Sequence, residues 1–148
     1  ARIKARALRS VKNEHWVLGE DSGLQVTAMD NLPGIHSARY AGDKASDSEN
    51  NAKLLKMLKI RGIRDRSANF CCCLCVYAPN GQEYIFTGLL QGQISSKLAG
   101  DVGFGYDPVF IPDGETKTLA ELGLAFKNKV SHRAQAVREF LTKLNPEG

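Results

Sequence analysis

A glycine-rich aromatic loop in this chain combines residue types suited to holding a flat, polar ligand. Gly103-Phe104-Gly105-Tyr106-Asp107-Pro108 brackets one ring with glycines, then adds a second ring, a carboxylate and a stiffening proline. Glycines let the backbone approach a flat ligand closely, while rings stack on it and a carboxylate accepts its hydrogen bonds. The loop is therefore predicted to bind a base or a sugar.

An acidic pair, Glu20-Asp21, lies between the apolar run Trp16–Leu18 and Ser22-Gly23. Carboxylates at the end of a buried strand suit Mg²⁺, which takes one or two of them together with waters and phosphate oxygens. A carboxylate beside such an ion is placed to accept a proton from water. Asp-Ser-Gly also forms turns, so an ordinary surface turn is the alternative.

Cationic residues gather at the start of the last expected helix: Lys127 and Lys129 precede it, and His132 and Arg133 open it. A helix N-terminus attracts anions, so cations there are unfavourable unless an anion binds among them. The pattern predicts an anion site. Arg39 lies beside an aromatic residue in a loop, and its spacing leaves open whether it contacts phosphate or pairs with an acid.

Length and composition indicate one globular domain spanning residues 1–148. The chain is 43% hydrophobic, 24% charged and carries a formal net charge of +4. No apolar run approaches the roughly 20 residues that cross a bilayer, so no membrane association is expected. The positive charges are dispersed rather than clustered, which suits a small anionic ligand and disfavours a nucleic acid partner.

Four cysteines crowd into one short segment, at Cys71, Cys72, Cys73 and Cys75. They lack the paired C-x-x-C spacing of zinc sites. In an extended strand, Cys71, Cys73 and Cys75 share one face and Cys72 takes the other. We expect small apolar side chains in a buried strand, kept reduced in the cytoplasm.

The hydrophobic pattern predicts an α/β protein with a mixed sheet and flanking helices. The strongest local signals are Asn80-Gly81, typical of a hairpin, and the capping boxes Ser46-x-x-Glu49 and Thr118-x-x-Glu121. Strands are expected at 16–18, 24–28, 70–78, 83–88 and 109–111, and helices at 1–12, 46–62, after 118 and after 131. The acidic pair is expected to interrupt the first strand at its carboxyl end, where open α/β sheets bind ligands.

Four segments occur here in one order: E-D-S-G-L, L-P-G-I-H-S-A-R-Y-A-G, G-F-G-Y-D-P-V-F and K-N-K-V-S-H-R. This series resembles the inosine triphosphate pyrophosphatase family, and the resemblance spans nearly the whole chain. It implies an elongated α/β fold with a central cleft, a homodimer, and magnesium-dependent hydrolysis of ITP, dITP or XTP to the monophosphate and pyrophosphate.

The resemblance also implies individual roles. Asp21 matches the proton acceptor and a metal ligand, with Glu20 beside it on the metal. The remaining matches are to substrate-binding positions: Ser22, Phe104, Gly105, Tyr106, Asp107, Lys127, His132 and Arg133. His132 and Arg133 match residues facing the 6-keto edge, where cationic donors favour an oxo group over the 6-amino group of adenine.

One departure from the family concerns its phosphate-cradling loop, T-x-N-x-x-K, which is not found in these 148 residues. The chain is accordingly expected to lack the N-terminal segment of the family. The alternative function is then a non-catalytic nucleotide-binding or oligomerising module that keeps the base pocket.

Overall fold

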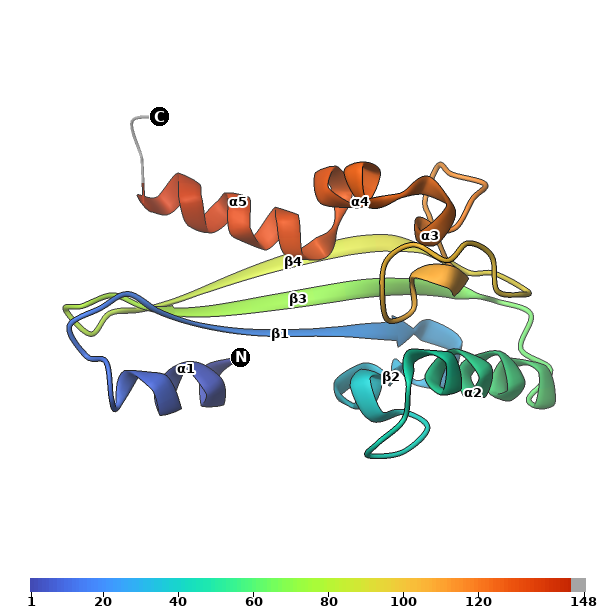
Figure 1. Cartoon of the computed structure of the whole chain (residues 1–148), viewed down its shortest axis with the longest axis horizontal. Coiled ribbons are helices and arrows are strands. Elements are labelled where there is room, and N and C mark those ends of the chain that lie inside the picture. The colour runs from blue at the N-terminus through green and yellow to red at the C-terminus, as the bar shows by residue number, and fades with distance from the viewer. Residues whose placement is uncertain (145–148) are drawn as a thin grey trace. The chain divides into compact units, whose positions relative to one another are not determined.

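The computed structural model describes residues 1–144 and contains a five-stranded sheet in the order β2-β1-β3-β4-β5 (Figure 1). The strands are β1 (Val17–Val26), β2 (Leu32–Pro33), β3 (Ser67–Tyr77), β4 (Glu83–Ile94) and β5 (Phe110–Pro112). The α-helices are α1 (Arg2–Arg9), α2 (Asp47–Ile60), α3 (Leu119–Leu122), α4 (Leu124–Val130) and α5 (His132–Leu144). Short 3₁₀ helices are η1 (Thr27–Met29), η2 (Gly34–Arg39) and η3 (Asp107–Val109).

The α/β fold class with flanking helices is confirmed, and both outer pairs of the sheet, β1 with β2 and β4 with β5, are antiparallel. The predicted hairpin joins β3 to β4, and Gly81 adopts a positive φ of 91° in its turn. Both capping boxes form as expected. In the first, the Ser46 backbone N–H donates to Glu49 Oε2 at 2.7 Å, and the Ser46 side chain caps the Glu49 N–H in return.

The expected interruption at the acidic pair is wrong, because β1 continues without a break through Glu20, Asp21 and Ser22. The turn-forming tendency of Asp-Ser-Gly is local, and pairing with the neighbouring strand β3 outweighs it. Glu20 and Asp21 therefore lie in the middle of a strand rather than beyond its carboxyl end.

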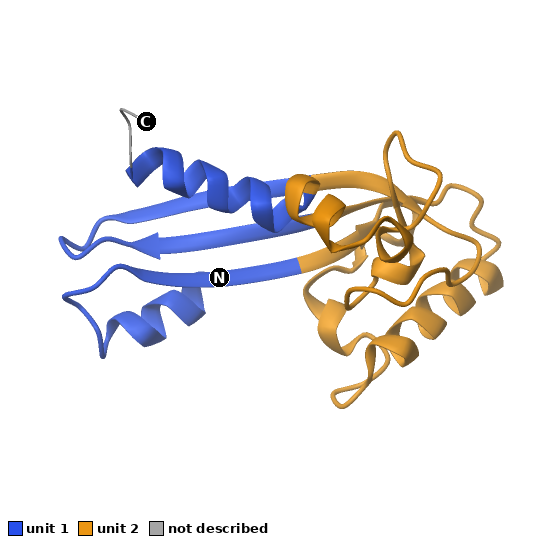
Figure 2. Ribbon diagram, turned by 45° about the horizontal axis from the view of Figure 1, so that its top comes forward, with its two compact units in different colours: residues 1–22, 71–89, 131–148 blue, residues 23–70, 90–130 orange. Residues whose placement is uncertain are grey.

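The chain divides into two compact units, shown in different colours in Figure 2. Unit 1 comprises residues 1–22, 71–89 and 131–148, of which the structure describes those up to 144, and unit 2 comprises residues 23–70 and 90–130. Three strands, β1, β3 and β4, contribute to both. The single-domain organisation stays a prediction.

In unit 1 the sheet carries a helix on each face. Ala5 of α1 packs with Val17, Cys75 and Tyr77 on one face. On the other face, Ala136 of α5 packs with the even-numbered β3 residues Cys72, Leu74 and Val76. The predicted split of Cys72 from Cys75 is thereby confirmed, since alternate residues of a strand face opposite sides.

Unit 2 has the larger core, built where α2 and the loops pack against the sheet. Leu54 and Leu58, one turn apart on α2, are fully buried against strand residues including Val26 and Phe110. Apolar residues at that spacing form the buried stripe of an amphipathic helix. This core fixes the start of α2, to which the glycine-rich loop is hydrogen-bonded.

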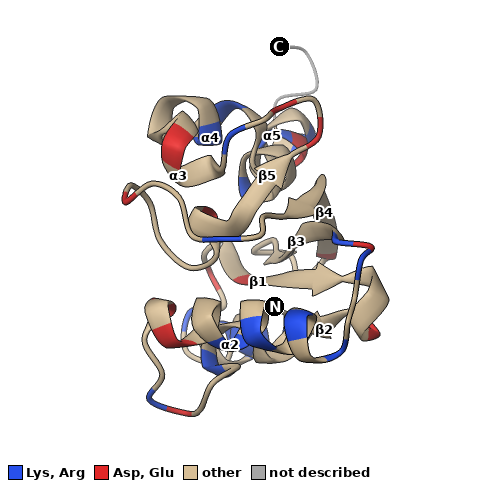
Figure 3. Ribbon diagram, turned by 90° about the vertical axis from the view of Figure 1, so that its right-hand side faces the viewer, with Lys and Arg blue, Asp and Glu red and all other residues tan. Residues whose placement is uncertain are grey.

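Charged residues of both signs occur along α2 and around α4 and α5 (Figure 3). Within residues 1–144, the structure has no helix with the length and apolar character needed to span a membrane.

Candidate functional site

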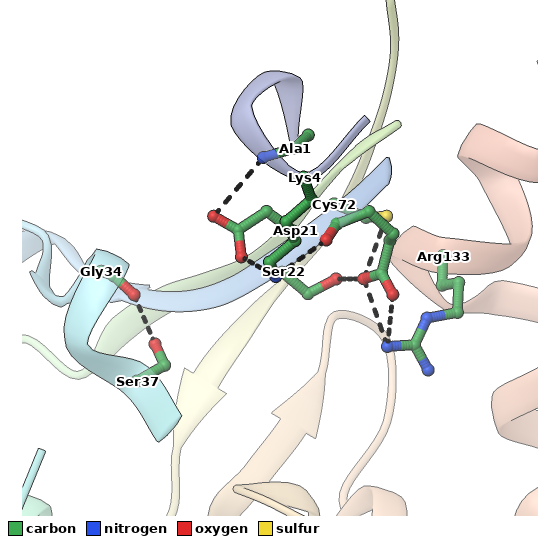
Figure 4. Close-up of polar contacts among 9 residues, drawn as sticks. Ala1, Lys4, Asp21, Ser22, Gly34, Ser37, Cys72 and Arg133 are labelled. Carbon is green, nitrogen blue, oxygen red and sulfur yellow. Dashed lines mark hydrogen bonds and ion pairs between the residues drawn. The ribbon is translucent and has the colours of Figure 1, made fainter. Parts of the chain in front are cut away.

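Strand β1 directs the acidic pair to opposite faces of the sheet in unit 1. Glu20 pairs with Arg133 of α5, and α5 covers one face. Asp21 lies on the other face, where α1 packs, and pairs with Lys4; Figure 4 labels Asp21, Lys4 and Arg133. Alternation along a strand requires this separation once β1 runs straight through the pair. The two carboxylates are adjacent in sequence yet are placed in different surroundings.

The Glu20 carboxylate accepts contacts from three different elements. Arg133 Nη2, in the first turn of α5, lies 3.1 Å from Oε2 and 3.2 Å from Oε1. Oε1 also accepts a hydrogen bond from the Ser22 hydroxyl, and Cys72 Sγ on β3 lies 3.7 Å away. Burial raises the pKa of the Cys72 thiol to about 11, so it stays protonated near neutral pH and can donate.

Competing effects act on the pKa of Glu20. Partial burial raises it, but the hydrogen bonds from Ser22, Arg133 and Cys72, together with the positive charge of Arg133, outweigh burial, and the pKa falls below its ordinary 4.5. A carboxyl group with a lowered folded-state pKa stabilises the fold above its unfolded pKa. That stabilisation is lost as the pH falls through the folded-state pKa.

We therefore expect the free energy of unfolding to depend less on pH in acid for Glu20→Gln than for the unchanged protein. Below pH 4.5 the free energy of unfolding should fall more steeply for the unchanged protein than for Glu20→Gln. Urea unfolding at pH 6, 4 and 3 measures this difference. Glu139→Gln, an exposed substitution on α5, is the matched control, and identical acid limbs for all three proteins would contradict the expectation.

Asp21 is half-exposed, with 52% of its side chain accessible. Its Oδ1 lies 3.1 Å from Lys4 Nζ, and the same ammonium group donates to the Glu20 carbonyl oxygen at 3.0 Å. Lys4 therefore links α1 to the backbone and side chain of the acidic pair. An exposed ion pair of this kind leaves the carboxylate accessible to water.

A single carboxylate, that of Asp21, fits Mg²⁺ as a ligand on its face, because this ion is commonly held by one or two carboxylates with waters and substrate phosphates. Glu20 does not fit as a second ligand to the same ion in this arrangement, because it faces the other side of the sheet and pairs with Arg133. Across residues 1–144, no three acidic, histidine or cysteine side chains come together as a ready-made metal site.

Gly88 of β4 lets the start of α5 approach the sheet. A Cβ added at this position would lie 1.8 Å from the carbonyl oxygen of His132, which is itself buried. The close approach sets the position of His132 and of the following Arg133. Gly88 is absent from the sequence-based candidates, since only the packing of two distant segments shows its role.

Replacing Gly88 with Ala is expected to push α5 away from β4 and lower the free energy of unfolding by about 1–3 kcal/mol. Urea unfolding measures the effect. Thr87→Ala, at the adjacent exposed position of β4, is the control and should change stability by less than about 0.5 kcal/mol. A Gly88→Ala protein as stable as this control would show that α5 accommodates the methyl group.

In unit 2, the glycine-rich loop is anchored by a buried ion pair. Asp107 is 2% exposed, and its Oδ2 accepts from Lys127 Nζ of α4 at 2.5 Å and from the Phe104 backbone N–H at 3.1 Å. A Cβ at Gly103 would lie 2.2 Å from this carboxylate, so the preceding turn requires glycine. Asp107 and Lys127 thus serve the loop itself.

Phe104 is 57% exposed, and Lys127 Nζ lies 3.7 Å from the centroid of its ring. A cation at this distance from a ring is attracted to its face. One ring face is therefore covered by Lys127. Tyr106 is buried instead, and its hydroxyl donates to the Ser37 carbonyl oxygen of η2 at 2.7 Å.

The structure brings some of the predicted residues of each unit into contact, and it buries His132 at the start of α5. In unit 1, Glu20, Ser22 and Arg133 cluster while Asp21 faces away. In unit 2, Arg39 is exposed at the end of η2. The sequence analysis did not identify five residues that contact the predicted ones: Lys4, Asp47, Asn51, Cys72 and Gly88. For Asp47 and Asn51 a signal was available, because the Ser46 capping box marks where α2 begins.

Comparisons with known proteins place similar sequences over most of this chain. A protein of Bdellovibrio bacteriovorus called dITP/XTP pyrophosphatase is 60% identical over 144 residues, covering 97% of this chain and 72% of the relative. One of Opitutus terrae with the same name is 47% identical over 137 residues, covering 92% of this chain and 68% of the relative.

Solved structures with the same fold include the Ham1 protein of Staphylococcus aureus. It superposes with a TM-score of 0.93 at 38% identity, covering 100% of this chain and 76% of that one. A HAM1 protein of Coxiella burnetii gives a TM-score of 0.84 at 38% identity, covering 89% of this chain and 68% of that one. The Ham1 family model matches residues 1–143, and the chain therefore belongs to the Ham1 family.

Proposed function

We propose that this chain hydrolyses deaminated purine nucleoside triphosphates, namely dITP, ITP and XTP, to the monophosphate and pyrophosphate. The observation that carries the proposal is its 60% identity, over 97% of its length, to a protein called dITP/XTP pyrophosphatase. The described side chains supply suitable chemistry: an accessible carboxylate on β1, cationic donors at the start of α5 and an exposed ring in the glycine-rich loop.

In this reaction water adds to a phosphorus atom, the bond from that phosphorus to the pyrophosphate leaving group breaks, and the water loses a proton. We assign the proton acceptor to Asp21, because its carboxylate is half-exposed. Mg²⁺, held by Asp21 with phosphate oxygens and waters, would polarise the phosphoryl group. Glu20, paired with Arg133, acts as a positioning residue for the start of α5.

Substrate contacts are assigned separately in each unit: to donors at the start of α5 in unit 1, and to the glycine-rich loop in unit 2. A 6-oxo group accepts hydrogen bonds from His132 and Arg133, whereas the 6-amino group of adenine donates and is disfavoured. Phe104 stacks on the base. Ser22 and Arg39 are assigned further substrate contacts. The loop residues Gly105, Tyr106, Asp107 and Lys127 act by holding the loop.

The four free cysteines suit the reducing cytoplasm, which we propose as the location of the protein. The homodimer implied by the family resemblance stays a prediction. Sedimentation velocity of the purified chain measures the oligomeric state.

Pyrophosphate release from dITP with Mg²⁺, measured beside dATP and dGTP, tests the proposed function. We expect kcat/KM for dITP to exceed that for dATP by roughly 100-fold or more. The hydrogen-bond donors His132 and Arg133 match the 6-oxo group of hypoxanthine and not the 6-amino group of adenine. Binding of inosine monophosphate with no turnover of any triphosphate would instead support the non-catalytic nucleotide-binding alternative.

A further inference from the structure

Two side chains of α2 hold both backbone groups of Gly105, the second glycine of the aromatic loop. The Gly105 N–H donates to Asp47 Oδ2 at 2.7 Å, and the Gly105 carbonyl accepts from Asn51 Nδ2 at 2.8 Å. Asp47 and Asn51 are four residues apart, so they lie on one face of the helix. Together these two contacts form a clamp on Gly105.

Asn51 is placed at some energetic cost, which argues that its amide serves a purpose. The residue is 2% exposed, and its Nδ2 also donates to the Asp47 carbonyl oxygen at 2.9 Å. Its Oδ1 is buried with no hydrogen-bond partner among the described residues. A buried acceptor without a partner is destabilising, and an apolar residue would avoid that penalty.

The clamp holds Gly105 in one backbone conformation, although glycine can adopt many others at similar energy. Gly105 has a positive φ of 62°, and a Cβ there would meet no atom within 4 Å. Packing around the α-carbon therefore does not impose this conformation. The two hydrogen bonds fix the peptide planes on either side of Gly105, because each peptide group is planar.

Fixing the Phe104–Gly105 peptide also fixes the exposed aromatic ring. Lys127 covers one face of Phe104, and Asp107 Oδ2 accepts from the Phe104 N–H. With the Gly105 N–H held by Asp47, the backbone on both sides of Phe104 is anchored. A ring held in one orientation binds a base without first having to be ordered.

We propose that Asp47 and Asn51 are positioning residues for base stacking, acting through Gly105 on Phe104. This inference rests on the proposed function, because it takes the base of the triphosphate to be the group that stacks on Phe104. A stacking surface is tolerant of base identity, since every base presents a π-face. Loss of the clamp should therefore weaken binding of all purine substrates alike.

The test compares Asn51→Leu and Asp47→Ala with the unchanged protein, using dITP and dGTP as substrates. We expect KM for both nucleotides to rise about tenfold, with kcat changed less than about threefold and the ratio of kcat/KM for dITP to kcat/KM for dGTP unchanged. Asp47→Asn keeps an oxygen acceptor for the Gly105 N–H and should retain most of the affinity. Glu49→Ala weakens the same helix terminus without contacting Gly105, and should leave KM unchanged.

Hydrogen exchange at the Gly105 amide gives a readout independent of activity. Protection in the unchanged protein and its loss in Asp47→Ala are expected. A merely structural role for Asp47 and Asn51 would lower the active fraction, and hence the apparent kcat, without moving KM. Unchanged KM in both variants, with normal dITP hydrolysis by the parent, would overturn the inference and leave the proposed function intact.

Failure of the proposed function is a separate result. If the parent protein releases no pyrophosphate from dITP but binds inosine monophosphate in calorimetry, weaker binding by both variants still supports the clamp. Equal binding by the parent and both variants overturns it. If the parent binds neither nucleotide, the inference falls together with the proposed function.

Discussion

Replacing Asp21 with Asn is expected to lower kcat for pyrophosphate release from dITP by about a thousandfold. An amide cannot accept the proton that the attacking water loses, and it is a poorer ligand than a carboxylate for a hard cation. Asp21 is half-exposed and pairs with an exposed Lys4, so the substitution should change stability by less than about 1 kcal/mol. Steady-state kinetics with a pyrophosphate-coupled assay measure the rate.

Asp113→Asn is the matched control, since it makes the same chemical change at an exposed position just after β5. Its kcat should equal that of the unchanged protein. Circular dichroism and urea unfolding establish that the Asp21→Asn protein is folded. A folded Asp21→Asn enzyme with its full rate would remove Asp21 from the reaction and, with it, the assignment of the proton acceptor.

Replacing Lys127 with Met is expected to lower the free energy of unfolding by about 3–5 kcal/mol. The substitution keeps much of the side-chain volume but leaves the Asp107 carboxylate, 2% exposed, without its cation. It also removes the ammonium group from the Phe104 ring, so KM for dITP should rise. Urea unfolding at neutral pH measures the change, provided that the dependence of the free energy of unfolding on urea concentration is the same in both proteins.

The Lys127→Met/Asp107→Asn double variant should recover part of this loss, because no unpaired charge is then buried. Arg2→Met breaks the exposed pair with Glu83, whose side chains are 54% and 27% accessible, and should cost less than about 1 kcal/mol. Equal losses for Lys127→Met and Arg2→Met would mean that the buried pair contributes no more than the exposed one.

Local sequence signals predicted most elements of this fold, because the interactions behind them span only a few residues. The Asn80-Gly81 hairpin, both capping boxes and the alternation of Cys72 and Cys75 were all confirmed. Their physical causes are a backbone that turns at glycine, side chains that reach their own helix terminus, and the period of two in a strand. Four short sequence segments likewise indicated the family.

The same local reasoning was wrong at the acidic pair, where the expected turn is a continuous strand. Pairing along a long strand is a non-local interaction, and its hydrogen bonds outweigh the weak turn preference of Asp-Ser-Gly. That pairing sends Glu20 toward Arg133 and Asp21 toward Lys4, so the two carboxylates take different partners.

By itself, the sequence determined the α/β class, most element positions and the residue types available for chemistry, since each follows from local backbone and side-chain preferences. Only the tertiary structure decided which of those residues meet. The Glu20–Arg133 contact joins residues 113 positions apart, and the Asp47–Gly105 contact joins residues 58 apart. Such contacts form because packing of the helices and loops on the sheet brings distant segments together, and no local propensity encodes them.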